Sequence, residues 1–472
     1  SLTGEVTSLR KENAKLRKNI SCLKEKNSLL EERTKNLELE NHILRNDNER
    51  MKRILNNDSS NSSIPPSKDQ PGKAPNPFNS RRPTKKKPGA QPGHKGKGLS
   101  KAKVEQKIRE GFFEHRIEEI GIPGRNYITR YRLDLEVRTV ATEVRIYADR
   151  DGKFIVPNDL KADVSYGSNI KAIAAFLYSE GVVANDRICT FINSLSGDSL
   201  SLSTGSVYGF CRTFAKSCSC VCSTLDQQLL NSYEICTDAT PVKTNGKQTY
   251  IRNFSTEKTV RYCSCGKKDL DTLGNLKLLK EFAGALTHDH ETALYHFGRK
   301  HGECNVHLAR YLLKNTEETG NLWSHNLSSF LNGMNQARKE RRSQGYHSFS
   351  AEQLEIYSQR YDEILAIGWK QNKHTRGRIA RKEEKALLNR LKKYKENHLL
   401  FLYDFQIHFS NNMSEKDLRI CKNRQKMAGG FRTESGRQMY CEIMSVIETM
   451  KRRGLNIFQG IISLLDGTPV IS

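Results

Sequence analysis

A strict seven-residue leucine repeat fills the first 57 residues and constrains the fold more than any other pattern in the chain. With leucine at the d positions, asparagine recurs at the a positions, which favours a parallel two-stranded coiled coil with a fixed register. Opposite charges also occupy matching g and e positions, as in Glu12 and Arg17. A single amphipathic helix on a globular core is the disfavoured alternative. We expect residues 1–57 to form a leucine-zipper homodimer through Leu9, Asn13, Leu16, Leu23, Leu30, Leu37 and Leu44.

The chain is strongly basic, with a formal net charge of +25 over 472 residues. An excess of this size predicts a polyanionic partner, and nucleic acid is the first candidate. An acidic membrane surface is the alternative, but no apolar run approaches the ~20 residues that a spanning helix needs. None of the 12 cysteines lies between Cys22 and Cys189, which argues against a secreted disulfide framework. We therefore expect a soluble cytoplasmic protein with no membrane partner.

Residues 58–110 are rich in Pro, Gly and Lys. Such a composition cannot bury a core and predicts an extended linker. Its cations would neutralise DNA phosphates with little base selectivity. A merely solubilising linker is the alternative. The DNA-binding candidates in this linker are Arg81, Arg82, Lys85, Lys86, Lys87 and Lys95.

Residues 111–230 change from a β pattern to a helical one. Alternating β-branched residues within 127–147 predict a small β-rich module over 111–160, which must fold by packing alone because it contains no cysteine. Residues 161–230 form a helical DNA-binding candidate, with one helix over 184–194 and a second from Ser201 or Ser203 to about Lys216. An ordinary helical pair and a helix-turn-helix motif are both compatible with this pattern. The latter would place three residues in a DNA groove, namely Thr204, Ser206 and Tyr208.

Asp238 lies inside a predicted strand, Tyr233–Val242. A buried carboxylate in a strand is costly unless it is paired or bound to a cation. A turn at Asn245 and Gly246, two more strand-like runs and a short apolar run ending at Asp289 follow. Two carboxylates at strand ends of one sheet can hold two divalent cations against a phosphodiester, and oxygen ligands suit Mg²⁺ or Mn²⁺. Asp289 has the alternative of a turn aspartate, and His288 is an alternative local ligand.

Several stretches resemble the IS66 family of bacterial insertion-sequence transposases. Asn61–Ser67 and Lys87–Gly96 resemble its N-terminal signature, which follows a leucine-rich coiled coil. Thr237–Val242 is similar to the first aspartate motif, although Ala239 stands where the family usually has Glu, and Gly284–His290 is similar to the second. The C-terminal block of the family, where Glu completes an Asp-Asp-Glu triad, is matched by Asn411, Asn412, Glu415, Arg419 and Lys426–Arg432.

The resemblance implies a multidomain chain with an α/β ribonuclease-H-like catalytic domain. Asp238, Asp289 and Glu415 would be its catalytic and metal-binding residues, holding two Mg²⁺ or Mn²⁺ ions. The first part of this domain would span 231–303 and a helical insertion 304–405, with the catalytic Glu helix and a C-terminal helix in 406–472. The basic face of the insertion is a further candidate for DNA, or else a solvated helix face. DNA phosphate is also expected to meet Arg419, Lys422 and Arg432.

Two residue patterns leave alternatives open. Glu415 falls at the capping-box position if Asn412 is the N-cap of its helix, and then it is a cap and nothing more. Cys304 and His307 match a Cys-x-x-His pair found in many transposases with an inserted catalytic domain. His307 would then orient the scissile phosphate or the attacking water, or the pair simply packs. In a third interpretation, Cys304 and His307 join Cys263 and Cys265 in a structural zinc site.

We therefore expect a bacterial, nucleoid-associated DNA transposase. It would bind the ends of an insertion sequence, hydrolyse phosphodiester bonds there and transfer the freed 3′ ends to target DNA. The expected partners are terminal inverted repeats, target DNA, a second copy of the chain and, as the family implies, small accessory proteins of the same element. Two alternatives stay open: a ribonuclease-H-like nuclease that cleaves without joining, and an inactive or domesticated DNA-binding protein.

Overall fold

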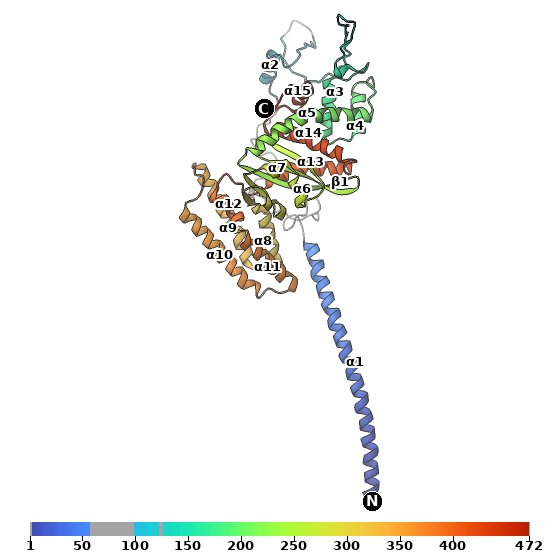
Figure 1. The fold of residues 1–472 in the computed structure, drawn as a ribbon, viewed down its shortest axis with the longest axis vertical. Coiled ribbons are helices and arrows are strands. Elements are labelled where there is room, and N and C mark those ends of the chain that lie inside the picture. The colour runs from blue at the N-terminus through green and yellow to red at the C-terminus, as the bar shows by residue number, and fades with distance from the viewer. Residues whose placement is uncertain (1, 57–98, 122–125, 472) are drawn as a thin grey trace. The chain divides into compact units, whose positions relative to one another are not determined.

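The computed structural model describes residues 2–56, 99–121 and 126–471. These residues fall into two compact units (Figure 1). The sheet unit comprises the described parts of 81–304 and 406–472. The helical unit comprises the described parts of 1–80 and 305–405. The two aspartates and the glutamate singled out above all belong to the sheet unit.

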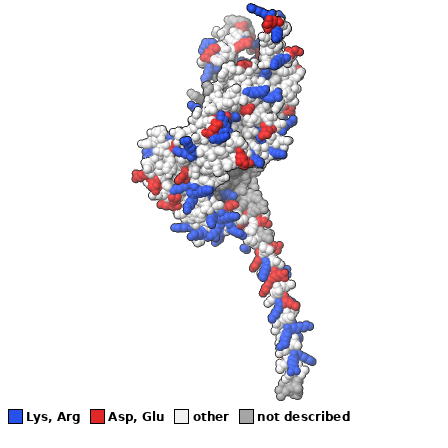
Figure 2. Space-filling model, viewed as in Figure 1, with Lys and Arg blue, Asp and Glu red and all other residues white. Residues whose placement is uncertain are grey.

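The leucine repeat lies on one continuous helix, α1 (Leu2–Asn56), as expected for this segment. Its d-position leucines from Leu9 to Leu44 are exposed in the single chain, including Leu23 and Leu37. Lys, Arg, Asp and Glu side chains alternate along the helix surface (Figure 2). A contiguous row of exposed leucines on a helix marks an interaction surface, so this stripe calls for a packing partner.

The sheet unit is built on a mixed five-stranded sheet of order β3-β2-β1-β4-β5. Strand β2 is antiparallel to β1 and β3, whereas β4 is parallel to β1 and β5. The expected hairpin turn is present, with positive φ at Asn245 and Gly246. The strand bounds are β1 (Glu234–Thr244), β2 (Lys247–Ser255), β3 (Val260–Cys265), β4 (Ala285–His288) and β5 (Lys300–Glu303).

Both faces of this sheet are buried. Ile235 and Leu286 pack with residues of two short helices and the end of α5 on one face. Val242 and Tyr262 belong to the core on the other face, which also includes residues of α3, α4, α5, α13, α14 and α15. The helices are α2 (Lys101–Arg109), α3 (Ser168–Ser179), α4 (Asn185–Leu195), α5 (Thr204–Leu230), α6 (Leu270–Gly274), α7 (Lys277–Glu281), α13 (Asn412–Ala428), α14 (Glu434–Arg452) and α15 (Ile457–Leu465), with 3₁₀ turns at Asn158–Leu160 and Thr292–His296.

Besides α1, the described part of the helical unit contains five helices, and in the sequence they separate the two segments of the sheet unit. A buried carboxylate, Glu384, accepts hydrogen bonds from Trp323, Asn321 and other neighbouring donors, and so joins three of these helices. The bounds are α8 (Asn305–Thr319), α9 (Leu322–Ser343), α10 (Ala351–Asn372), α11 (Arg378–Lys393) and α12 (Lys395–Tyr403).

The prediction of a β-rich module over 111–160 is wrong for its described residues. They contain no strand of the sheet, and a single bridge joins Ala148 to Phe154. The apolar half of the alternating pattern finds no surface to pack on: Leu135 is 85% exposed and Val140 is 79% exposed. Alternation specifies a strand only where one face can be buried, and here neither face is.

Two helix boundaries also differ from the expectation. The linker expected over 58–110 contains α2, because the Ser100 hydroxyl accepts the Lys103 N–H and Val104 is buried. Helix α5 begins at its Ser203 cap as expected but runs 27 residues to Leu230, well past Lys216. Buried Val221 and Leu225 extend its core-facing side.

Candidate active site

Asp238 and Asp289 are brought together because β1 and β4 are neighbouring parallel strands. Thr237 on β1 lies opposite His288, the last residue of β4, so the residue that follows each of them is an aspartate. The Asp238 carboxylate accepts the backbone N–H of Ala239 at 2.7 Å. The strand positions of both residues are therefore as predicted, and the pairing register brings them together.

Glu415 reaches the same region from α13, which packs against β1. The helix begins at Asn412, and Asn411 occupies the cap position without a side-chain cap bond. Asn412 is therefore not the N-cap, and the capping-box interpretation of Glu415 is wrong. The Asn411 amide instead donates to the Thr237 carbonyl at 2.8 Å, and its backbone N–H donates to the Cys304 sulfur at 3.2 Å.

Asn253 on β2 connects the backbone of Asp238 to the turn that carries Glu415. Its Oδ1 accepts the Asp238 N–H at 3.1 Å, and its Nδ2 donates to the Ser414 carbonyl at 3.1 Å. The same amide nitrogen lies 3.3 Å from a carboxylate oxygen of Asp417. Asn253 is fully buried. One side chain thus sets the spacing between two of the three acidic residues.

The far end of α13 is also attached to β1. Gly429 ends the helix with a φ of 70°, and Gly430 continues with a φ of 139°. A Cβ on Gly430 would lie 2.6 Å from the Lys243 carbonyl, so only glycine allows this approach. Phe431 N–H then donates to the Lys243 carbonyl at 2.8 Å. The two glycines therefore help to fix the helix that presents Glu415.

The electrostatics of Asp238 fit a divalent cation site. The pKa of Asp238 is raised from 3.8 to about 6: burial contributes most, the charges of Asp289 and Glu415 add to the increase, and the Ala239 N–H and Lys268 oppose it. Ligand atoms of Asp289, Glu415 and Cys304 lie within 4.8 Å of one another, and Asp238, which is outside this group, lies close enough for its pKa to respond to the charges of Asp289 and Glu415. Like charges held together in a partly buried place are relieved by a bound cation, and carboxylate oxygens suit Mg²⁺ or Mn²⁺.

Cys304 and His307 lie on either side of the boundary between the two units. Cys304 is buried at the end of β5, and His307 lies in the first turn of α8, where its Nε2 is 3.1 Å from an Arg310 guanidinium nitrogen. Cys263 and Cys265 lie on β3, at the opposite edge of the five-stranded sheet from β5. The four-residue zinc site is therefore excluded by topology, because three strands separate its halves.

His288 is not a metal ligand in this arrangement, since both its ring nitrogens are engaged. Nδ1 contacts the Asp289 carbonyl, and Nε2 lies 3.2 Å from Nδ1 of His301. Because the carbonyl can only accept, Nδ1 of His288 carries the proton and Nε2 accepts from His301. Burial lowers the pKa of both rings, to about 4 for His301, so both are neutral at pH 7.

A second group of residues that could bind a metal consists of Glu234 and Cys236 on β1 and His408, which precedes α13. The Glu234 carboxylate there accepts from the Thr287 hydroxyl, from the His408 backbone N–H at 2.9 Å and from its ring. These bonds already stabilise its charge. The crowded carboxylates around Asp238 are therefore the stronger metal candidate.

The family of the chain is identified by a comparison of its sequence with protein-family models. The model of the IS66 transposases matches residues 164–439, more than half of the 472-residue chain. The chain belongs to the IS66 family of transposases. The match runs from just before α3 into α14 and includes Asp238, Asp289 and Glu415. No match was found among the curated proteins.

As a member of the IS66 family, the chain is a transposase-type protein, a class of enzymes that act on DNA. No described helix combines the length and apolarity needed to span a membrane. The C-terminal DNA-binding candidates Arg419, Lys422 and Arg432 are all exposed. The linker candidates from Arg81 to Lys95 lie outside the described residues. Thr204 and Tyr208 are exposed at the start of α5, so a DNA contact there stays a prediction.

Sequence reasoning missed two side chains of this candidate site. Asn253 positions the acidic residues, and Lys268 lowers the pKa of Asp238. Asn411 was named only as part of the family block, without its contact to Thr237. Asn253 could have been found, because asparagine is disfavoured in the middle of a strand. Lys268 follows β3 by three residues and carries no local signal.

Proposed function

We propose that this IS66 family member is a metal-dependent Asp-Asp-Glu transposase that cleaves the ends of its element and joins them to target DNA. Asp238, Asp289 and Glu415 would hold two Mg²⁺ or Mn²⁺ ions. The observation that carries the proposal is the convergence of these carboxylates from three separate elements: ligand atoms of Asp289 and Glu415 lie within 4.8 Å of each other, and both charges raise the pKa of Asp238. The mixed sheet, with one aspartate on its central strand and one after the parallel neighbour, supports a ribonuclease-H-like assignment.

When bound, Mg²⁺ lowers the pKa of an attacking water and stabilises the leaving 3′ oxygen. The protein's part is to hold three carboxylates at fixed spacing, through Asn253 and Asn411, in a place that is partly shielded from water. Lys268 lies close enough to Asp238 to lower its pKa, and its ammonium also pairs with Glu291 at 3.7 Å. This ammonium is placed to attract a DNA phosphate toward the carboxylates.

Outside the carboxylate site, DNA would be bound by the exposed cations of α13. Arg419 and Lys422 follow Glu415 by four and seven residues, which places all three on one side of the helix. Such cations neutralise phosphates without reading bases. The basic linker and the start of α5 are the further DNA candidates. Two chains would be joined through the exposed leucines of α1, so that both element ends are processed together.

The test is a cleavage and joining assay with terminal inverted-repeat DNA, target DNA and Mg²⁺. Single substitutions Asp238→Ala, Asp289→Ala and Glu415→Ala should each abolish cleavage while leaving DNA binding intact. Retention of activity by Glu415→Ala would show that this triad is wrong. Cleavage without joining by the unaltered chain would instead identify a nuclease, and neither activity would identify a DNA-binding protein without catalysis.

A further inference from the structure

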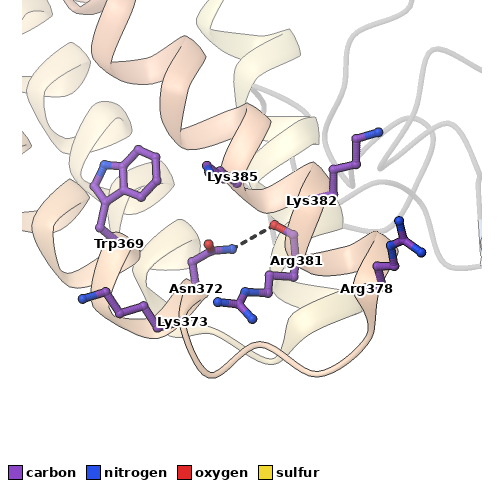
Figure 3. A pocket seen from close by; sticks show the side chains of 7 residues that line it. All are labelled: Trp369, Asn372, Lys373, Arg378, Arg381, Lys382 and Lys385. Carbon is purple, nitrogen blue, oxygen red and sulfur yellow. Dashed lines mark hydrogen bonds between the residues drawn. The ribbon is translucent and has the colours of Figure 1, made fainter.

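A basic pocket on the helical unit is unrelated to the carboxylate site. Its volume is about 470 Å³, and it lies between the last turn of α10 and the first half of α11 (Figure 3). Five of the lining residues are cations and none is acidic. The lining consists of Trp369, Asn372, Lys373, Arg378, Arg381, Lys382 and Lys385. On the viewed face of the molecule, Lys and Arg gather over this part of the helical unit (Figure 2).

The cations of the pocket lie at the N-terminus of α11, which is the positive end of its helix dipole. Arg378, Arg381 and Lys382 lie at the start of this helix, its first turn contains no acid, and Gly377 provides no side-chain cap. Helix N-termini are stabilised by anions and destabilised by cations. The three cations are therefore unfavourably placed in the field of the helix dipole, and the Glu49 carboxylate of α1, which lies near Gly377, offsets part of this repulsion. A bound phosphate would reverse the sign of the interaction, because cations and helix dipole would then attract the same group.

The floor of the pocket is a fixed hydrogen-bonded frame. Asn372 is buried, and its amide donates to the Arg381 carbonyl at 3.0 Å and to Glu384 at 2.9 Å (Figure 3). The Thr375 hydroxyl donates to Glu384 at 2.5 Å, and so does the indole N–H of Trp323 at 2.7 Å. These bonds hold the connection between the helices in place. The cations are therefore attached to a rigid frame rather than to a loose surface loop.

Trp369 adds an aromatic surface to this cationic pocket. Trp369 is half-buried. It lies with Lys373 on one side of the pocket, and Arg378 and Lys382 of α11 lie on the other side (Figure 3). An indole next to phosphate-binding cations is the combination that binds a nucleotide by base stacking. Bases inside a duplex present their edges only, so stacking on Trp369 requires an unpaired or extruded base.

We propose that this pocket binds an unpaired nucleotide of DNA, with its base on Trp369 and its phosphates on Arg378, Arg381 and Lys382. This proposal rests on the proposed function in one respect only, because it takes the polyanion that binds to the pocket to be DNA. It requires none of the carboxylates. Duplex DNA would meet the same cations but leave the indole unused, so the two forms of DNA are distinguishable at Trp369.

The test measures binding of fluorescent ten-nucleotide thymidine strands, matching abasic strands and blunt duplexes to the full chain without divalent cations. Trp369→Ala should weaken binding of the thymidine strand about tenfold, a loss of ~1.4 kcal/mol. Trp369→Phe should restore most of it, and duplex binding should not change. Lys382→Ala should weaken binding of every strand, whereas Lys339→Ala, an exposed lysine of α9 outside the pocket, should not.

Intrinsic fluorescence gives a second readout. The chain has two tryptophans, and Trp323 is fully buried. Stacking should therefore quench Trp369, and the quenching should disappear in Trp369→Phe. Equal binding of thymidine and abasic strands, or equal losses for strand and duplex in Trp369→Ala, would overturn the proposal. Asp238→Ala separates the two ideas: it should abolish cleavage under the proposed function and leave all these binding results unchanged.

Discussion

The side-chain carbonyl of Asn253 accepts the backbone N–H of Asp238 at 3.1 Å. Because the amide of Asn253 also donates to Ser414, immediately before Glu415, this contact couples a strand carboxylate to a helix carboxylate. The spacing between the two acids is therefore set by a residue that bears no charge and touches no substrate. Asn253 is a positioning residue, and its removal should affect catalysis and metal affinity together.

Asn253→Ala should reduce cleavage about a hundredfold, since displacement of a catalytic group by about 1 Å has that effect. The unpaired groups left behind should also cost about 1–3 kcal/mol of stability. The rate and the Mn²⁺ concentration for half-maximal cleavage should be measured well below both melting temperatures. Asn315→Ala is the control, because Asn315 is also a buried asparagine but belongs to the helical unit, where its amide bonds to Ser324 at 3.1 Å. An unchanged Mn²⁺ requirement in Asn253→Ala would refute the positioning role.

Asp238→Asn should stabilise the metal-free protein at pH 8 but not at pH 4. The folded pKa of about 6 lies above the ordinary 3.8, so the protonated form is favoured in the fold. The associated stability is complete below pH 3.8 and lost as the pH rises through 6. Asparagine keeps the Ala239 contact without the charge, which should gain on the order of 1–3 kcal/mol at pH 8.

Thermal melts across pH, with and without Mn²⁺, measure this effect. Mn²⁺ should raise the melting temperature of the original chain and leave that of Asp238→Asn nearly unchanged. A variant that is equally stabilised by Mn²⁺ would exclude Asp238 as a ligand. A variant that is less stable than the original at pH 8 would contradict the raised pKa.

Leu23→Lys combined with Leu30→Lys should convert a dimer to a monomer, because both leucines occupy the d stripe of α1. Light scattering after size-exclusion chromatography gives the mass directly. The matched control is Leu29→Lys with Leu39→Lys, since these leucines are equally exposed but lie off the stripe. Dissociation by the control pair, or a monomeric original chain, would contradict the coiled-coil dimer.

Glu384→Ala should lower the stability of the helical unit by about 3 kcal/mol, since hydrogen bonds to a charged group are each worth about 1.5–3 kcal/mol. Donors from Thr375, Trp323, Asn321 and Asn372 hold the pKa of Glu384 below 4.5, against the effect of its burial. The stability they supply is therefore present above pH 4.5 and lost as the pH falls through the lowered pKa. If Glu384→Ala melted at the same temperature as the original chain at pH 7, these hydrogen bonds would not stabilise the helical unit as predicted.

The parts of the fold that local signals specify could be predicted from the sequence. Asn245 and Gly246 require positive φ, so the β1–β2 hairpin follows from turn chemistry. Ser203 caps α5 through the Ser206 N–H, as its residue type predicts. The alternating pattern within 127–147 failed because alternation says nothing about whether a packing surface exists. Leu135 meets none.

The candidate site depended on information that is not local. Asp238 was recognisable inside a strand and Asp289 at the end of one, but their adjacency comes from the parallel register of β1 and β4. Glu415 was identified through a family resemblance, and its local pattern pointed to a helix cap. The structure removed that alternative because the helix begins at Asn412 and the Asn411 amide bonds to Thr237. Long-range contacts of this kind leave no periodic trace in a sequence.

The most direct test of the carboxylate site is metal-directed cleavage of the protein itself. Fe²⁺ replaces Mg²⁺ at oxygen-ligand sites, and with peroxide and ascorbate it cuts nearby backbone. The account predicts cuts close to residues 238, 289 and 415, which excess Mg²⁺ suppresses and Asp238→Ala abolishes. Cuts near 238 and 289 with none near 415, or three cuts that persist in Asp238→Ala, would contradict a shared cation site.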